Sequence, residues 1–268
     1  MLAGKIDSEV KEAPLISIIT VVYNGYPAVE ATLLSVLSLN YPAIEYILID
    51  GCSNDGTVEI IKKYKDRIAS WVSEPDQGIY HAMNKGIERA TGEWINFMNC
   101  GDRFATFDVL EIFKDEQINA DIVYGEAMIE YPTFETRYER FPLKNMWKRM
   151  PFCHQACFVR TSIMKVYKFD LHYALSADFD FMYRAYTNGK DFLFINKVIC
   201  RFDFTTGASR NYGLLSTKER RDSVLKHEFS LLKWLYYFVL IAYVRLSGSV
   251  KRMVGEKLTA WVTRLLRT

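Results

Sequence analysis

The sequence has few of the features that mark secreted, disulfide-rich or nucleic-acid-binding proteins. Only five cysteines stand among its 268 residues, and an odd, scattered set does not suggest a disulfide framework and fits a reducing cytosol. Basic residues exceed acidic ones by only two charges, so no nucleic-acid-binding surface is expected. Residues 1–14 hold no apolar run, so no secretory signal is expected either.

Two familiar phosphate-binding glycine motifs are also absent. No G-x-G-x-x-G follows the first expected strand, and no G-x-x-x-x-G-K-[ST] occurs. These absences argue against a dinucleotide-binding Rossmann site and against a P-loop nucleotide hydrolase. Cys153, His154 and Cys157 are close enough to suggest zinc, but no fourth ligand of suitable spacing is evident, which disfavours a structural zinc site.

What the first part of the chain does contain is a regular alternation of strand-like and helix-like segments. Short apolar runs predict strands at 15–23, 46–49, 69–73 and 94–98, and helical periodicity predicts helices at 29–39, 58–64 and 79–90. Strands and helices that alternate at this spacing predict βαβ units with a mainly parallel sheet, flanked by helices.

Polar side chains stand where several of these strands end. Asn24 and Asp50 follow the first two strands, and Asp102 follows the strand at 94–98. Ligands of open α/β sheets bind beyond the carboxyl ends of the strands. A carboxylate at that edge is suited to Mg²⁺, which takes one or two protein carboxylates together with substrate phosphates. The alternative for Asp102 is a cap on the next helix, near Phe107.

The second half of the sequence is less regular. Strands are expected at 121–129, 134–141, 155–160 and 192–204, with the first two as a candidate antiparallel pair. A helix is expected at 177–187, with Ser176 as its N-cap and apolar residues along one face.

Several short segments, in this order, carry a resemblance to a known family: SIITVVYN at 17–24, IDGCSNDGT at 49–57, SEPDQGIYHAMNKG at 73–86, NCGD at 99–102, HQA at 154–156 and ADFD at 177–180. Together they resemble the family-2 glycosyltransferases with the GT-A fold, in the branch that builds bacterial O-antigen and capsular polysaccharides. The resemblance covers roughly residues 14–210.

The resemblance implies a domain organisation. Residues 14–212 would form the GT-A domain, with a nucleotide-binding half at 14–102 and an acceptor-binding half at 103–212. Residues 213–268 would form a helical C-terminal extension.

The resemblance also implies an activity. The protein would be an inverting, metal-dependent hexosyltransferase that uses Mg²⁺ or Mn²⁺ and moves a sugar from a nucleotide-diphosphate-sugar, with a UDP-sugar expected, to a glycan or lipid-linked acceptor. Two alternatives remain: a sugar-phosphate nucleotidylyltransferase, and a nucleotide-sugar-binding module without turnover. The first should carry a Gly-rich basic loop after the first strand, where this chain has Asn24-Gly25-Tyr26-Pro27.

Donor-site roles can be carried over from the family by motif. Asp50 matches a residue that contacts the nucleotide base, with a loop cap as the alternative, and Asp102 matches the metal ligand. The sequence departs from the family at Asn99 and Gly101, where Asp is frequent, so metal binding would rest on one protein carboxylate together with the diphosphate and water. The further donor-site candidates are Tyr23, Asn24, Asp76 and Lys85, and Lys85 has a solvated helix charge as its alternative.

The catalytic base is a choice between Asp178 and Asp180. Asp178 matches the motif and lies in the first helical turn, where the helix dipole favours the ionised form. Asp180 has Arg184 four residues further on, a spacing typical of an ion pair on a helix. His154 is a candidate for the acceptor side, with a satisfied core histidine as the alternative.

The C-terminal segment predicts a membrane contact. The apolar run at 234–244 is rich in Trp and Tyr and is shorter than the ~20 residues a spanning helix needs. Apolar residues near helical spacing continue after it, interleaved with the basic residues Arg245, Lys251, Arg252, Lys257, Arg264 and Arg267. Such a helix lies in the headgroup layer. A peripheral location on the cytoplasmic face of the membrane is therefore expected, with packing on the core or in a dimer as the alternative.

Overall fold

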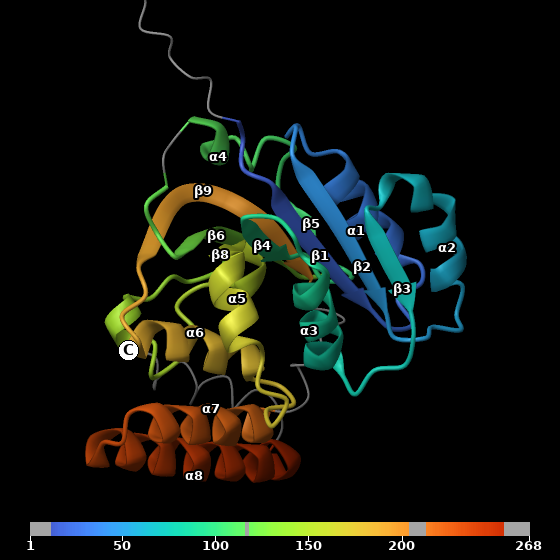
Figure 1. Ribbon diagram of the computed structural model, residues 1–268. Helices are drawn as coiled ribbons and strands as arrows, with labels where there is room; N and C mark the ends of the chain where they lie inside the picture. Colours follow the sequence, from blue (N-terminus) through green and yellow to red (C-terminus); the bar gives the residue numbers. More distant parts are fainter. Residues whose placement is uncertain (1–11, 116–117, 204–212, 255–268) are drawn as a thin grey trace, which may run out of the picture.

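The computed structural model describes residues 12–115, 118–203 and 213–254. Its centre is a curled nine-stranded sheet in the order β3-β2-β1-β4-β8-β6-β9-β5, with β7 paired to β6, and helices cover both faces (Figure 1). The strands are β1 Ile16–Val22, β2 Ile44–Asp50, β3 Ser70–Ser73, β4 Trp94–Phe97, β5 Arg103–Phe104, β6 Ile122–Glu130, β7 Glu135–Arg137, β8 Cys157–Arg160 and β9 Phe192–Asp203.

The first half follows the predicted alternation of strand and helix. β3, β2, β1 and β4 lie side by side and pair in parallel. Successive residues of β1 point to opposite faces, with Ile18 in one apolar core and Ile19 in the other. The connecting helices are α1 Ala28–Leu37, α2 Thr57–Lys63 with the short turn η1 Lys65–Arg67, and α3 Ile79–Arg89.

The prediction of a mainly parallel sheet is correct only for this half. β8 runs antiparallel to β4 and to β6, β9 is parallel to β6, and β5 is antiparallel to β9. The sheet is mixed because the chain leaves β4, crosses to β6 and returns through β8 next to β4. The predicted strand at 134–141 shortens to β7, while β5, α4 Ile112–Asp115 and α5 Thr161–Tyr167 were not predicted.

A buried polar residue fixes the segment that returns to β4. Asn96, in the middle of β4, is fully buried, and its side-chain amide donates to the carbonyls of Gln155 at 2.9 Å and Cys157 at 2.8 Å. These bonds hold the short turn η3 His154–Ala156 beside the end of β4. The side chains of His154 and Gln155 are thereby brought close to the segment that ends in Asp102.

The C-terminal helices form a separate layer. α6 Ala177–Thr187 packs against α7 Gly213–His227, and α8 Leu231–Val254 lies beside α7 on the side away from the sheet (Figure 1). Tyr237 of α8 is buried, and its hydroxyl donates to the carbonyl of Trp147 at 2.7 Å, next to the turn η2 Leu143–Asn145. Within the described ranges, no helix is long and apolar enough to cross a membrane.

Candidate active site

A pocket opens at the carboxyl edge of the parallel strands, where the sequence predicts ligand binding. Its volume is about 430 Å³, within the roughly 300–1,000 Å³ of small-molecule sites. The end of β1, the start of α3 and the segment after β4 form its walls. The hydroxyl, amide and carboxylate side chains that line it belong to Tyr23, Asn24, Tyr26, Asp76 and Asn99.

Tyr23 and Asn24 reach this pocket from the end of β1. The side chain of Tyr23 is 66% exposed, so its ring face is open to a ligand. Asn24 has a φ of 49°, in the left-handed region that Asn tolerates better than most residues. Its side-chain oxygen accepts a hydrogen bond from the backbone N–H of Asn54 at 3.0 Å. Asn24 therefore joins the loops that follow β1 and β2.

Asp50 lies at the end of β2 and has no exposed surface. Its carboxylate accepts hydrogen bonds from the backbone N–H and hydroxyl of Ser53, at 3.0 and 2.5 Å, and from the hydroxyl of Ser73 at 2.6 Å. Asp50 thus holds the ends of β2 and β3 together. This is the contact expected of a loop cap, the alternative that the sequence offers to a contact with the nucleotide base.

Asp76 and Lys85 belong to the segment that leads into α3. Asp76 lines the pocket, and its Oδ1 accepts a hydrogen bond from the N–H of Gly78 at 2.8 Å. Lys85 is only 14% exposed, pairs with Glu74 at 2.9 Å and donates to the carbonyl of Pro75 at 2.8 Å. Lys85 is therefore neither a solvated charge nor a pocket residue, and it anchors the segment that carries Asp76.

Asp102 sits behind the pocket wall, one turn after Asn99. It is 4% exposed, and its two oxygens accept hydrogen bonds from Nε2 of Gln155 at 2.7 Å and from the N–H of Asp203 at 3.1 Å. Burial raises the pKa of Asp102 to about 6, an effect that the Gln155 hydrogen bond only partly offsets. The Asp203 carboxylate raises this pKa further, so a second acidic side chain lies within electrostatic range.

The chemistry of this pair fits a hard divalent cation. Among the described residues, each Asp102 oxygen accepts one hydrogen bond, and a carboxylate oxygen has a second lone pair. Mg²⁺ and Mn²⁺ prefer oxygen ligands. In the described part of the chain, no group of three or more His, Cys, Asp or Glu side chains is placed to hold a metal. A cation held at Asp102 would therefore take most of its ligands from the diphosphate and from water.

Asp178 and His154 form an ion pair beside the pocket. Nδ1 of His154 lies 3.2 Å from Oδ2 of Asp178, with the side chains 22% and 21% exposed. The hydroxyl of Tyr80 donates to Oδ1 of Asp178 at 2.8 Å. Burial would raise the pKa of Asp178, but the bonds from His154 and Tyr80 outweigh it and hold this pKa below 3.8. Asp178 is therefore ionised at neutral pH.

His154 is protonated in this pair. Burial lowers its pKa, but the hydrogen bond and charge of Asp178 prevail and raise the pKa to about 9. Both ring nitrogens of an imidazolium are donors, whereas Nε2 of His154 lies 3.3 Å from the amide nitrogen of Asn99. The buried Oδ1 of Asn99 has no hydrogen-bond partner among the described residues. Turning the Asn99 amide over places Oδ1 against the N–H of His154 Nε2 and pairs these two groups. The NH₂ group then takes the buried position of Oδ1.

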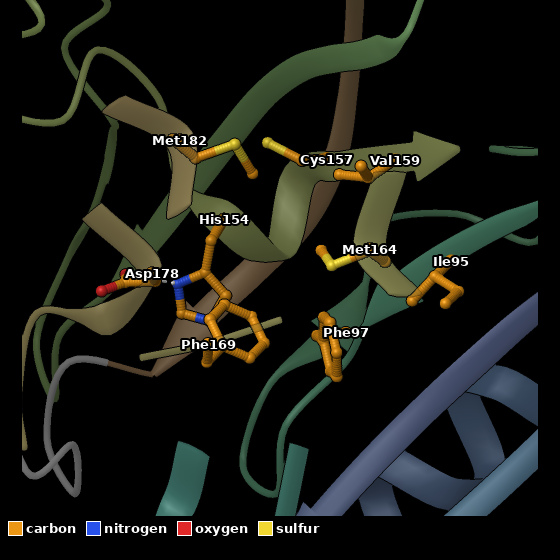
Figure 2. Close-up of a pocket in the computed structure, with 9 residues that line it drawn as sticks. All are labelled: Ile95, Phe97, His154, Cys157, Val159, Met164, Phe169, Asp178 and Met182. Atoms are coloured by element: carbon orange, nitrogen blue, oxygen red, sulfur yellow. Dashed lines mark ion pairs between the residues drawn. The ribbon is translucent and has the colours of Figure 1, made fainter. Parts of the chain in front are cut away.

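Apolar side chains surround the other side of this ion pair. Figure 2 shows His154 and Asp178 at one end of a narrow cavity, with Ile95 and Val159 at the other. The cavity has about 10 Å³ of space for the centre of a water molecule, roughly what a single water needs. Phe169, which lines it, is fixed by two hydrogen bonds of 2.9 Å to the side chain of Asn84. The ion pair is thus shielded from solvent on this side.

Asp180 lies two residues beyond Asp178 but faces the other way. It is fully buried between α6 and α7, where Oδ2 lies 2.8 Å from Nε of Arg184 and Oδ1 lies 3.0 Å from Nε2 of His227. The hydroxyl of Ser223 also donates to Oδ1 at 2.8 Å. The ion pair with Arg184 expected from the helical spacing is present, and the site offers an acceptor no access to Asp180.

The sequence reading missed Tyr80, Gln155 and Asp203 as site residues. Tyr80 lies inside a recognised segment, but only the fold brings its hydroxyl to Asp178, 98 residues further along the chain. Gln155 follows His154 in the HQA segment, and that adjacency was the available signal. Nothing in the local sequence around Asp203 indicates that its backbone binds Asp102.

Known proteins resemble this chain in both sequence and fold. The model of the family described as glycosyl transferase family 2 matches residues 17–175. A PGL/p-HBAD biosynthesis glycosyltransferase of Mycobacterium bovis is 31% identical over 183 residues, covering 66% of this chain and 71% of the relative. The putative teichuronic acid biosynthesis glycosyltransferase TuaG of Bacillus subtilis is 38% identical over 94 residues, 34% of this chain and 37% of the relative.

Two solved structures share the architecture. TarS 1-349 of S. aureus in complex with UDP-GlcNAc superposes with a TM-score of 0.67 at 16% identity, covering 91% of this chain and 76% of the TarS 1-349 chain. The mannosyltransferase PcManGT of Pyrobaculum calidifontis in complex with GDP-Man and Mn²⁺ gives 0.64 at 14% identity, covering 95% and 79%. At this identity the likeness shows the fold alone, which is the predicted GT-A type.

Proposed function

The chain belongs to glycosyl transferase family 2, and from that premise we propose that it is an inverting enzyme that moves a sugar from a nucleotide-diphosphate-sugar to a hydroxyl of a glycan or lipid-linked acceptor. The proposal rests on two features at one edge of the sheet. One is the 430 Å³ pocket, and the other is the ionised carboxylate of Asp178 beside it. The pocket would bind the donor, and Asp178 would serve the acceptor.

Asp178 is the proposed general base. The acceptor oxygen forms a bond to the anomeric carbon, the bond from that carbon to the diphosphate oxygen breaks, and the acceptor proton passes to Asp178. Tyr80 and His154 hold the carboxylate by its two oxygens, which fixes its direction and keeps it ionised. A single displacement of this kind inverts the anomeric configuration.

Asp102, together with Asp203, is proposed to hold Mg²⁺ or Mn²⁺. A bound divalent cation neutralises the charge that develops on the leaving diphosphate. Asn99 lines the pocket one turn before Asp102, and we propose that it contacts the same ligand.

The relatives support a role in the assembly of a surface polysaccharide. Their names refer to the biosynthesis of PGL/p-HBAD and of teichuronic acid, and TarS binds UDP-GlcNAc. We propose a polymer of the O-antigen or capsular kind, with a UDP-sugar as donor.

The experiment that tests the function is a panel of nucleotide-sugars offered to the purified protein with Mg²⁺ or Mn²⁺. Release of nucleoside diphosphate, together with a rise in unfolding temperature, supports a transferase. Binding without release of diphosphate supports the non-catalytic module instead. Release of pyrophosphate from a nucleoside triphosphate and a sugar phosphate supports the nucleotidylyltransferase.

The dependence of kcat on pH should reflect the ion pair between His154 and Asp178. His154 has a raised pKa of about 9, so its stabilisation of Asp178 is fully present below pH 6.5 and lost as the pH rises through about 9. Asp178 has a lowered pKa, so its share is present above pH 3.8 and lost as the pH falls through the folded value. We expect wild-type kcat to fall above about pH 9.

Replacing His154 by Gln should remove this alkaline limb. It should also move the acid limb to higher pH, because burial then raises the pKa of Asp178 without the opposing charge. His172→Gln is the matched control, since His172 is exposed on a loop outside the pair, and it should leave both limbs in place. An alkaline limb that persists in His154→Gln would contradict the assignment.

The outer face of α8 supports the proposed membrane contact. Lys233, Tyr237 and Ile241 form its buried stripe. The large apolar residues exposed on the remaining surface are Leu231, Leu232, Trp234, Leu235, Phe238, Val239 and Leu246. A face of this size marks an interaction site, and the basic residues of the C-terminal sequence suit anionic headgroups. We propose peripheral docking on the cytoplasmic face of the membrane.

Flotation with vesicles of anionic phospholipid tests this docking. The variant Leu235→Gln, Phe238→Gln and Leu246→Gln should bind vesicles at least about tenfold more weakly than wild type, because each exposed side chain loses apolar burial worth about 1 kcal/mol or more. The control replaces Phe107, Val166 and Leu171, which are equally exposed elsewhere, and should bind normally. Wild-type protein that stays with buffer but elutes as a dimer would show that α8 meets a second copy instead.

A further inference from the structure

The loop that leads into Asp178 is held by a buried carboxylate on another helix. Glu219 of α7 is 8% exposed. Its two oxygens accept hydrogen bonds from the backbone N–H groups of Ala174 and Leu175, each at 2.9 Å. Both residues belong to the segment between α5 and α6, a few positions before Asp178. Glu219 therefore fixes the backbone from which the first turn of α6, and with it Asp178, begins.

Glu219 belongs to a stripe of polar side chains at helical spacing along one face of α7. The members of this polar stripe are Ser216, Glu219, Ser223 and His227. The hydroxyl of Ser216 lies 3.0 Å from that of Ser176, the residue before α6. The hydroxyl of Ser223 and Nε2 of His227 lie 2.8 and 3.0 Å from Oδ1 of Asp180. Every member of the stripe thus contacts α6 or the residues that precede it (Figure 1).

Hydrogen bonds along this stripe fix α6 more closely than apolar packing would. Glu219 and Ser223 are buried, and a buried polar side chain stabilises a fold only when it has a partner. Apolar residues at these positions would pack α7 on α6 without setting its register. Hydrogen bonds depend on direction as well as distance, so the stripe also sets where the first turn of α6 lies along α7.

The Glu219 carboxylate also lies within electrostatic range of Tyr80, which donates to Oδ1 of Asp178. Burial is the main cause that raises the pKa of the Tyr80 hydroxyl well above its usual value, and the negative charges of Asp178 and Glu219 raise this pKa further. Tyr80 therefore keeps its proton and remains a donor. The carboxylate of Asp178 is held by Tyr80 and His154, while Glu219 holds the backbone that precedes it.

We propose that Glu219 is a positioning residue for the transfer reaction, which acts through the backbone at 174–175 to aim the Asp178 carboxylate at the acceptor hydroxyl. This inference rests on the proposed function, in which Asp178 is the general base. Proton transfer needs the base within hydrogen-bond distance of the acceptor oxygen, and a displacement of about 1 Å can cost on the order of 100-fold in rate. α7 then belongs to the catalytic unit rather than to an appended helical extension.

Release of nucleoside diphosphate, from the nucleotide-sugar that the panel identifies as donor, tests the proposal in variants of Glu219. Glu219→Ala removes both acceptors and should lower kcat by roughly 10–100-fold. The KM for the donor should change by less than about twofold, because Glu219 does not line the donor pocket. Glu219→Gln keeps one oxygen that can accept from Ala174 or Leu175 and should give an intermediate kcat. Asp222→Ala removes an exposed acid from the same helix and should keep the wild-type kcat.

A double variant decides whether Glu219 acts through the base. Once Asp178→Asn has removed the carboxylate, its position no longer matters, so adding Glu219→Ala should lower the residual turnover by less than about twofold. If Glu219→Ala does not fold, Glu219→Gln takes its place in this comparison. An equal fall in both backgrounds, or a wild-type kcat in the Glu219 variants, overturns the inference. Wild type without turnover, or Asp178→Asn with full turnover, would instead overturn the proposed function.

Discussion

Replacing Asp178 by Asn is expected to lower turnover by roughly 10²–10⁴-fold, the range that general bases contribute. The amide keeps the size of the side chain but cannot accept the acceptor's proton. Asp178 does not line the 430 Å³ pocket, so the affinity for the donor nucleotide should change by less than about twofold. A loss in kcat without a loss in binding is the signature of a group that acts in the chemical step.

Asp180→Asn is the matched control, because the same chemical change is made two residues away. Asp180 is fully buried against Arg184 and His227, so its loss leaves a buried cation without its partner. Because Arg184 is 18% exposed, we expect destabilisation on the order of 2–3 kcal/mol, below the value for fully buried pairs. Its unfolding temperature should fall by roughly 5–10 °C, while the folded enzyme keeps most of its kcat. The reverse ranking of the two variants would assign the base to Asp180.

The comparison of these two acids shows how far the sequence can go. Helical periodicity placed both Asp178 and Asp180 in the first turn of α6, and spacing alone predicted the ion pair between Asp180 and Arg184. The sequence did not reveal which acid faces the site. That depends on α7, which covers Asp180, and on η3, which brings His154 to Asp178.

The fold itself was predictable where the pattern is local. Apolar runs and turn residues identified β1 to β4 and α1 to α3, because β1, β4 and most of β2 are buried on both faces and each connection is short. The mixed order of the second half was not predictable, since it depends on contacts between distant segments. Asn96 is the clearest case: it is polar within an apolar strand, and its function is to bind carbonyls about sixty residues later.

Asp50 shows a case in which a motif match predicts the place of a residue, at the end of β2, but not the contacts of its side chain. The segment IDGCSNDGT ends a strand at the pocket edge, as expected. Its acid is nevertheless enclosed by the serine hydroxyls of Ser53 and Ser73, a result that depends on the loop geometry. Glycine at position 51 then opens the space that Asp76 enters from another loop.

Asp102→Asn, or removal of divalent cations with a chelator, should lower turnover by roughly 10²–10³-fold, because the charge on the leaving diphosphate is then left without its main stabiliser. The substitution keeps an oxygen that can accept from Gln155 or from the N–H of Asp203, so the protein should still fold. It removes the anionic oxygen that a hard cation prefers.

A binding measurement distinguishes this role of Asp102 from a purely structural one. With UDP or GDP present, Mn²⁺ should raise the unfolding temperature of wild type, because a ligand that binds only the native state stabilises it. The same addition should have little effect on Asp102→Asn. Asp108→Asn, a change at an exposed acid paired with Lys197, should respond to Mn²⁺ as wild type does. Two results would contradict this role: wild type that keeps its turnover with a chelator, and Asp102→Asn that Mn²⁺ still stabilises. Asp102 would then be a structural residue and the enzyme would be independent of metal. Such a result would fit its present hydrogen bonds to Gln155 and Asp203, which tie η3 and the end of β9 to the segment after β4.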